Sequence, residues 1–474
     1  MHFARFVVCY QIFLQPLIAA QAAQINYTPY SEARPILEAF GDQAPEPLRV
    51  VPPEKRVEAW NEWMKLRNKE IRERLAQGDA DSVINLLMFG TSFTKEPRLA
   101  TASLAVITDT ANNSANPKVA SALRSIFEKR VRDLVRSMGA SHMSERISFA
   151  RATLQRAGVN PTGPGRNDAQ GYLRANAMRV LREQTRFQEA LAEARRLQDP
   201  TDEFAQRSTL YAERGLSLDT SLPPNYAIEI ALAEMKARGL LRPNSVRRIG
   251  IIGPGLDFSD KQEGFDFYDI QTLQPFAVMD SLLRLGLARR GTLEVDALDI
   301  SPRVLDHVEL ARHSALQGQG YKIQLPRDAS RRWTRQLVAY WKRFGNQIGS
   351  LATPVAVPPG LQGLALHAVR VRPEFVKRMR SLDVNIVLQR EDAPDDAKFD
   401  LLIATNILVY YDTFEQCLAL KNIESMLRPG GFLLTNNLLL ELPSSKMKSV
   451  DYVSVEYSSR EADGDRIIWY RRDN

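Results

Sequence analysis

The sequence predicts an α/β protein in which a doubly wound, mostly parallel sheet ends in a C-terminal antiparallel hairpin and follows a mostly helical N-terminal region. From residue 247 onward, short apolar segments alternate with segments of helical periodicity, which is typical of a parallel sheet covered by helices on both faces. Residues 451–473 contain two strand-like segments around a glycine-containing turn, which predicts the hairpin. The N-terminal half has mostly helical periodicity.

Helical patterns in the N-terminal half cover 54–79, 79–90, 115–138 and 173–198. Residues 158–171 are rich in glycine, proline and asparagine, so they are the best candidate for a linker. The sequence therefore predicts a helical N-terminal domain at 23–160 and a helical linker or cap region at 161–244.

The C-terminal half contains the predicted strands and the helices between them. The strands are expected at 247–253, 291–301, 383–392, 398–406 and 430–439. The helices are expected at 274–290, 302–314, 373–381 and 413–428. This alternation predicts a Rossmann-like domain at 245–474.

Residues 1–22 have the pattern of a secretory signal peptide. Arg5 precedes an apolar stretch, and Ala20-Gln21-Ala22 offers a small-x-small cleavage site. The stretch is too short and too polar to span a bilayer stably. The alternative is an amphipathic N-terminal helix or a misplaced start. The sequence predicts an exported protein, periplasmic or secreted, if the signal is used, and a cytoplasmic protein otherwise.

Composition excludes several classes of protein. The 474 residues are 44% hydrophobic and 25% charged, as in ordinary globular proteins of two or three domains. Only Cys9 and Cys417 are cysteines, so no disulfide framework is expected. The five histidines lack metal-ligand spacing, so no metal is expected either.

The net charge of +7 is concentrated in one block. Residues 321–380 hold 12 Lys/Arg and 2 Asp/Glu, which suggests an insertion with a function of its own. Within it, Arg331–Phe344 predicts an amphipathic helix. This helix either covers the sheet as a solvated surface helix, or forms a lid that recognises an anionic acceptor or makes peripheral membrane contact. Nucleic acid is an unlikely partner because no binding module is recognisable.

A glycine turn follows the first predicted strand. Gly253, Pro254 and Gly255 either end the strand without a ligand or let the backbone approach one closely. Pro254 has no N–H, and no third glycine or GK[ST] follows, so pyrophosphate is a poor fit. Asp299 ends the second strand, where a carboxylate can accept hydrogen bonds from a ribose diol. Capping the next helix is the alternative role, for which Ser301 is better placed.

The C-terminal half of the sequence resembles a known family. The stretches "LEVDALDIS" and "FDLLIATNILVYYDTFEQCLALKNIESMLRPGGFLLTNN", with the terminal hairpin, resemble class I S-adenosylmethionine-dependent methyltransferases. The segment "FDLLIATNILVYYD…LRPGGFLL" is most similar to the chemotaxis-receptor methyltransferase branch. The resemblance covers about residues 245–474, roughly half of the chain.

The resemblance implies a Rossmann-like methyltransferase fold with seven strands, the last two supplied by the hairpin. It implies S-adenosylmethionine over the Gly253-Pro254-Gly255 turn, with Asp299 and its neighbour Ile300 at the ribose. It also implies other contacts: Arg390 and Glu391 at the adenine, and Asn406, Tyr410 and Tyr411 near the methyl group, the two tyrosines as candidate substrate contacts.

Three departures from the family pattern stand at the glycine turn. Ile251 occupies the position of an expected acid, and Asp257 that of a third glycine. The 44 positions from Gly255 to Asp299 exceed the ~20 usual for this unit. The extra residues are expected to close over the cofactor, to replace missing contacts, or to occlude a degenerate site.

These observations favour a methyltransferase with an unidentified acceptor. Methyl transfer from a sulfonium requires mainly alignment, so no catalytic residue is predicted. The alternative is a non-catalytic exported protein that keeps the fold as a binding or interaction module. Ile251 favours that alternative, and so does the export signal, because S-adenosylmethionine is a cytoplasmic metabolite. A nicotinamide-dependent oxidoreductase is disfavoured by the hairpin and by Pro254.

Overall fold

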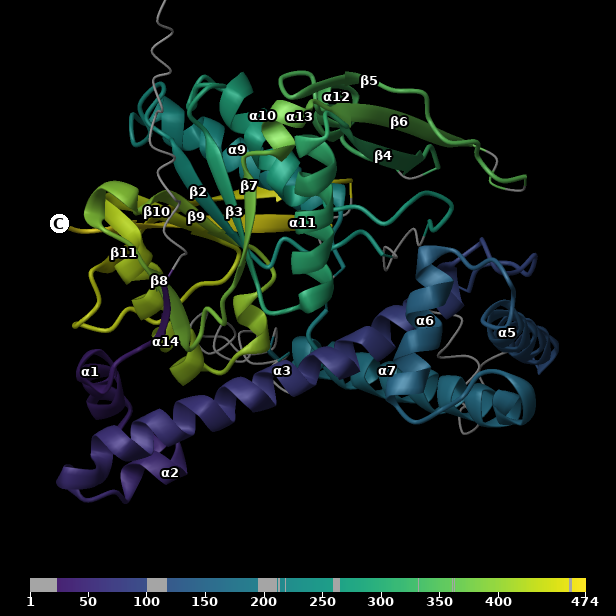
Figure 1. Cartoon of the computed structure of the whole chain (residues 1–474), viewed down its shortest axis with the longest axis horizontal. Coiled ribbons are helices and arrows are strands. Elements are labelled where there is room, and N and C mark those ends of the chain that lie inside the picture. Colours follow the sequence, from purple (N-terminus) through teal and green to yellow (C-terminus); the bar gives the residue numbers. More distant parts are fainter. Residues whose placement is uncertain are drawn as a thin grey trace, which may run out of the picture.

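The computed structural model shows a sheet domain and a long helical arm (Figure 1). It describes residues 24–99, 117–194, 211, 214–217, 219–258, 265–330, 332–359, 361, 363–459 and 463–474. The predicted signal peptide at 1–22 lies outside the described residues. No described helix is long and apolar enough to span a bilayer.

The main sheet has seven described strands, six of which run in the same direction while β12 runs the opposite way. They are β2 (Arg248–Ile252), β3 (Glu294–Asp299), β7 (Met379–Asp383), β9 (Phe399–Ala404), β10 (Leu427–Thr435), β11 (Met447–Glu456) and β12 (Gly464–Arg472). Their order is β11-β12-β10-β9-β2-β3-β7, and β12 runs antiparallel to β10 and β11. The predicted fold class is therefore confirmed, including the hairpin.

The central strands form because nearly every residue in them is buried. In β9, Leu401 and Ile403 face one core, whereas Leu402 faces the other, as expected for a sheet covered on both sides. Gly250 of β2 lies opposite Leu402 of the neighbouring parallel strand β9, and a Cβ atom at Gly250 would stand 2.4 Å from Leu402 Cδ2. The strand is thus glycine-dependent at its centre.

Helices cover the two faces of the sheet. The first face carries α9 (Leu222–Ala237) and α10 (Gln274–Arg284), and α11 (Pro302–Leu316) packs beside β3 and β7. The second face carries α14 (Thr413–Met426), which begins at an Asp412–Glu415 capping box. The helices predicted at 302–314 and 413–428 are thereby confirmed, whereas the one predicted at 274–290 ends already at Arg284.

Two predictions at the third strand are wrong. The helix expected at 373–381 is only the four-residue α13 (Pro373–Val376), and the sheet strand is β7 rather than 383–392. The chain leaves the sheet after Asp383 and turns at Asn385. The apolar run that follows packs into the core of the second face, and β8 (Gln389–Asp392) then pairs with β1 (Gln24–Tyr27).

The basic block lies largely between β3 and β7. It forms β4 (Tyr321–Asp328), α12 (Arg335–Arg343), β5 (Gly349–Leu351) and β6 (Leu364–Val371), with a separate antiparallel sheet in the order β4-β6-β5 (Figure 1). On α12, Leu337, Tyr340 and Trp341 are buried in the core of the first face. The apolar face of this helix therefore packs inside the protein.

The N-terminal region is helical, as predicted. Its elements are α1 (Tyr30–Phe40), η1 (Gly41–Gln43), α2 (Glu46–Arg49), η2 (Pro53–Lys55), α3 (Arg56–Phe89), α5 (Pro117–Ser137), α6 (Glu145–Arg156), η3 (Gly163–Gly165) and α7 (Arg166–Ala194). Figure 1 shows α3 running from the sheet domain to the cluster of α5, α6 and α7. Two further 3-10 turns, η4 (Asp395–Ala397) and η5 (Leu408–Tyr410), flank β9.

One helix, α3, replaces the two expected at 54–79 and 79–90. The helix continues through Gly78. A glycine stands at this position because another backbone segment passes close to it. A Cβ atom at Gly78 would lie 1.8 Å from the carbonyl oxygen of Leu216. The predicted boundary at residue 160 falls within a single hydrophobic cluster that joins α3, α5, α6 and α7.

Candidate functional site

A cavity of about 1220 Å³ opens at the carboxyl ends of β2, β3 and β9. Open α/β sheets bind their ligands at this edge. The helical region, the basic insertion and the hairpin all contribute walls, so the cavity is bounded by segments far apart in the sequence. Among the described residues, no group of three His, Cys, Asp or Glu side chains could hold a metal ion.

The glycine turn forms part of the cavity wall. Gly253 and Gly255 have φ angles of 65° and 66°, in the left-handed region that favours glycine. A Cβ atom at Gly253 would also lie 2.1 Å from Ile407 Cδ1. Both glycines line the cavity, whereas Pro254 is buried and does not. Ile251, at the position of the expected acid, lies fully in the core.

Asp299 lies in the cavity wall at the end of β3. Its Oδ1 accepts a hydrogen bond from the Ser301 amide (2.8 Å), and within the described residues no basic side chain forms an ion pair with it. Burial raises the pKa of the Asp299 carboxyl to about 6, against backbone hydrogen bonds that lower it. Ile300 lines the cavity beside it. The carboxylate is thus available to a ligand that donates hydrogen bonds.

This raised pKa predicts pH-dependent ligand binding. A diol donates its hydrogen bonds to the ionised carboxylate, so the affinity for S-adenosylhomocysteine is expected to be constant well above pH 6. It should fall as the pH drops below 6, approaching tenfold per unit. Calorimetric titrations between pH 5 and 8 measure this profile, and a flat profile would contradict a ribose contact at Asp299.

The same pKa fixes the sign of an effect on stability. The folded-state pKa lies above the ordinary value of 3.8, so ionised Asp299 destabilises the ligand-free protein above about pH 6. This contribution disappears as the pH falls from 6 toward 3.8. Binding a diol removes part of the same cost.

The residues expected at the adenine do not line the cavity. The Arg390 guanidinium bonds Glu32 of α1 (2.8 Å) and Asp392 (3.0 Å). The Glu391 carboxylate bonds Arg248 at the opposite, amino end of β2 (2.6 Å). The reason is that the third strand ends at Asp383, so the wall is formed by the residues directly after it, Val384 and Ile386.

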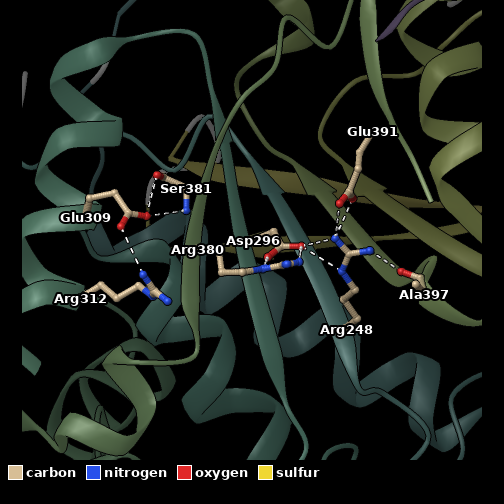
Figure 2. Close-up of polar contacts among 8 residues, drawn as sticks. All are labelled: Arg248, Asp296, Glu309, Arg312, Arg380, Ser381, Glu391 and Ala397. Carbon is tan, nitrogen blue, oxygen red and sulfur yellow. Dashed lines mark hydrogen bonds and ion pairs between the residues drawn. The ribbon is translucent and has the colours of Figure 1, made fainter. Parts of the chain in front are cut away.

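Glu391 belongs to a buried charge network at the amino edge of the sheet (Figure 2). The fully buried Asp296 carboxylate of β3 accepts hydrogen bonds from Arg248 on β2 (2.6 Å) and Arg380 on β7 (2.7 Å). Arg248 also bonds Glu391 and the Ala397 carbonyl. The network joins three neighbouring segments of the sheet.

Asp296→Asn is expected to lower the free energy of unfolding by about 3 kcal/mol, because it leaves two guanidinium groups short of a buried partner. Urea unfolding followed by circular dichroism measures this. The matched control is Asp395→Asn, which breaks an exposed ion pair with Lys398 (2.8 Å) and is expected to change nothing measurable. Equal stabilities of the two variants would contradict a structural role for the network.

Three further predicted residues meet at the cavity. Asn406 follows β9 with a φ of 59° and exchanges hydrogen bonds with Asn436 after β10 (2.8 and 2.5 Å). Tyr410 lies against Tyr211, with ring centroids 5.7 Å apart. Tyr411 is buried, which raises the pKa of its hydroxyl, and like Asn406 and Tyr410 it lines the cavity.

The extra residues after Gly255 form part of the wall. The described part includes Asp257, which accepts hydrogen bonds from Tyr268 and Gln271 (both 2.8 Å). Arg146 of α6 reaches this segment and donates to four of its carbonyl groups. These are the carbonyls of Asp257, Phe258, Asp266 and Tyr268. The segment is therefore fixed by the helical arm, and the cavity beside it stays open.

Several lining residues were missed from the sequence. They come from the segment before α9, the insertion and the hairpin, and include Asp219, Trp333, Tyr457, Asp463 and Asp465. No motif marks them, because they reach the cavity only through tertiary contacts. The hairpin residues Tyr457, Asp463 and Asp465 had one usable signal. They flank the hairpin turn, and the hairpin must place this turn at the carboxyl edge of the parallel strands.

The basic block presents little charge to the cavity. Arg332 and Trp333 line it, whereas Arg343 pairs with Glu229 (2.5 Å) and Arg380 with Asp296. Arg331 lies outside the described residues. An anionic acceptor and peripheral membrane contact through 331–344 stay predictions.

No protein-family model matches the sequence, and neither does any curated protein. Several solved structures with some likeness to the chain are methyltransferases. They include magnesium protoporphyrin IX methyltransferase from Synechocystis PCC 6803 with bound S-adenosylmethionine (11% identity, 57% of this chain, 84% of that chain, TM-score 0.26). Mitomycin 7-O-methyltransferase has 13% identity and a TM-score of 0.28, and the match covers 89% of this chain and 100% of that chain. The CurJ carbon methyltransferase has 12% identity and a TM-score of 0.25, and the match covers 94% of this chain and 99% of that chain. Because these TM-scores are below 0.5, the fold assignment rests on the strand order and the hairpin.

Proposed function

We propose that this protein is an S-adenosylmethionine-dependent methyltransferase. The observation that carries the proposal is Asp299, a buried carboxylate without a described ion pair, in the wall of a large cavity next to the glycine turn. A carboxylate in this position at the end of the second strand suits a ribose diol. The chemotaxis-receptor branch and the identity of the acceptor stay open predictions.

The residues around Asp299 fit the cofactor. Gly253 and Gly255 present backbone without side chains at the cavity wall, where the methionine part would pass, and Gly253 could not carry a side chain because its Cβ atom would meet Ile407. The apolar side chains of Ile300, Val384 and Ile386 offer flat contacts for an adenine. Bound S-adenosylmethionine would supply a methyl group on a positively charged sulfur.

The protein's own contribution is then alignment and exclusion of water. The insertion, the helical arm and the hairpin enclose the cavity, and Asn406 with Tyr410 stands between the cofactor wall and the hairpin wall. Holding the nucleophile in line with the methyl carbon supplies most of the rate enhancement in such a transfer.

Calorimetric titration of the full chain with S-adenosylmethionine and S-adenosylhomocysteine tests the proposal. We expect one site for each compound and competition between them. Absence of binding for both would overturn the proposal. Binding without any transfer of a tritiated methyl group to a broad panel of amines, hydroxyls and carboxylates would instead favour a binding module.

A further inference from the structure

The wall of the cavity farthest from Asp299 is formed by the hairpin. Since β12 runs antiparallel to β10, with Thr435 opposite Ile468, the start of β12 projects beyond the carboxyl edge of the parallel strands. Asp465 lies at this start and lines the cavity. Four strand positions separate β3 from β12, or about 19 Å at ~4.8 Å per strand. The cavity is therefore long enough for a cofactor at one end and an acceptor at the other.

Asp465 is held by two neutral donors. The Tyr457 hydroxyl donates to its Oδ2 (2.6 Å), and the Asn436 side chain also donates to the carboxylate. Asn436 in turn donates to Asn406 Oδ1, after β9 (2.5 Å). The carboxylate is thus linked by hydrogen bonds to the loop beside the expected methyl position. Burial raises its pKa, so it is a better proton acceptor than an exposed aspartate.

The surroundings of Asp465 combine aromatic rings and negative charge. The Thr334 amide donates to the Tyr457 carbonyl (2.9 Å), which brings Trp333 of the insertion next to the hairpin. Tyr410 lines the same cavity from the β9 side. Carboxylates and aromatic faces together recognise alkylammonium groups.

The charges of the lining agree with a cationic guest. The acidic members of the described lining are Asp219, Asp257, Asp299, Asp463 and Asp465. Arg332 is the basic member among the described lining residues, and it is exposed. An anionic acceptor would meet this excess of carboxylates, whereas an ammonium ion would be attracted by it.

We propose that the hairpin end of the cavity binds an alkylamine acceptor in its ammonium form, and that Asp465 is the catalytic residue that removes its proton. This inference rests on the methyltransferase function and specifies its substrate class. Tyr457 and Asn436 are positioning residues, since they act through Asp465.

The chemistry balances without another reactant. Asp465 accepts one proton from the ammonium group, which leaves a neutral amine with a free electron pair. That pair forms the new N–C bond to the methyl carbon while the C–S bond breaks and its electrons stay on sulfur. The products are a methylated ammonium ion, a neutral thioether and a protonated Asp465, which returns its proton to water.

Binding of n-butylammonium, with butyrate as the anion of equal length, tests the inference. Both are titrated calorimetrically into the full chain saturated with S-adenosylhomocysteine. We expect n-butylammonium to bind, butyrate not to bind, and Asp465→Asn to weaken n-butylammonium binding at least about tenfold. Unchanged affinity for S-adenosylhomocysteine shows that the variant is folded.

Glu456→Gln is the matched control, because Glu456 is an exposed acid on the same hairpin outside the lining. It should leave n-butylammonium binding unchanged. Butyrate binding as tight as n-butylammonium binding, no n-butylammonium binding, or no effect of Asp465→Asn would overturn the inference. Weakening by Glu456→Gln as large as that by Asp465→Asn would overturn it too.

Tyr457→Phe adds a readout that a merely structural role would not change. The described groups that face Asp465 are Tyr457, Asn436 and Asp463. Loss of the hydroxyl donor should raise the pH midpoint of n-butylammonium binding, and an unshifted midpoint would contradict ionised Asp465 as the binding group. If S-adenosylhomocysteine fails to bind while n-butylammonium binds in an Asp465-dependent manner, the proposed function falls and the amine site remains.

Discussion

Replacing Asp299 with alanine is expected to weaken S-adenosylhomocysteine binding at least about 100-fold. The carboxylate is the hydrogen-bond acceptor for two ribose hydroxyls in the proposed complex, and each bond to a charged group contributes about 1.5–3 kcal/mol. Calorimetry at pH 7.5 and above, where the carboxylate is ionised, gives the largest difference. Because ionised Asp299 destabilises the ligand-free protein, the variant should remain folded.

Asp306→Asn is the control for this measurement. Asp306 lies on α11, seven residues further along, with its side chain exposed and outside the cavity. It should bind S-adenosylhomocysteine as the unmodified protein does. An Asp299→Ala variant with undiminished affinity would refute the ribose contact, although other parts of the site could still hold the ligand.

Arg146→Met is expected to lower the free energy of unfolding by about 3–5 kcal/mol, the usual cost of leaving buried polar groups without their charged partner. The guanidinium is 2% exposed and donates to four carbonyl groups of the segment after the glycine turn. Methionine fills much of the same volume but donates no hydrogen bond. Urea unfolding of the full chain measures the loss, and S-adenosylhomocysteine affinity should fall with it, since this segment forms a cavity wall.

Arg151→Met provides the comparison on the same helix. Arg151 is half-buried and forms no ion pair with the described part of the chain. Its replacement should cost less than about 1 kcal/mol. If both arginine variants lost the same stability, the effect would reflect the helix surface rather than the four carbonyl contacts.

The sequence was sufficient where chemistry and strand are adjacent in the chain. Gly253 and Asp299 each follow an apolar strand directly, and parallel strands must bring their carboxyl ends together. Their position at the cavity could therefore be predicted without knowledge of the packing. The hairpin was predictable for a similar reason, because its two strands and its turn are contiguous.

Arg390 and Glu391 show where such reasoning stops. The run 383–388 is as apolar as a sheet strand, and periodicity cannot tell a buried strand from a buried irregular segment. In the structure this run turns at Asn385 and packs under α14. The strand lies a few residues nearer the N-terminus than predicted. Arg390 and Glu391, predicted to contact the adenine, therefore lie away from the cavity.

Arg146 and Asp465 were beyond prediction for a different reason. Arg146 acts on a segment more than a hundred positions away, and Asp465 reaches Asn406 through Asn436. Neither relation leaves a local pattern. Only the packing of the helical arm and the hairpin onto the sheet creates these contacts.

The whole protein carries a positive net charge, whereas the charged residues of its described cavity lining are mainly negative. This difference has a kinetic consequence. A cationic ligand first approaches a molecule of net charge +7 and then enters a space in which carboxylates outnumber basic groups among the described charged lining residues. Added salt screens the distant repulsion over ~8 Å at physiological ionic strength, whereas enclosed charges are screened much less. We therefore expect a higher ionic strength to speed the association of cations with this protein, the reverse of the usual behaviour of an acidic binding site.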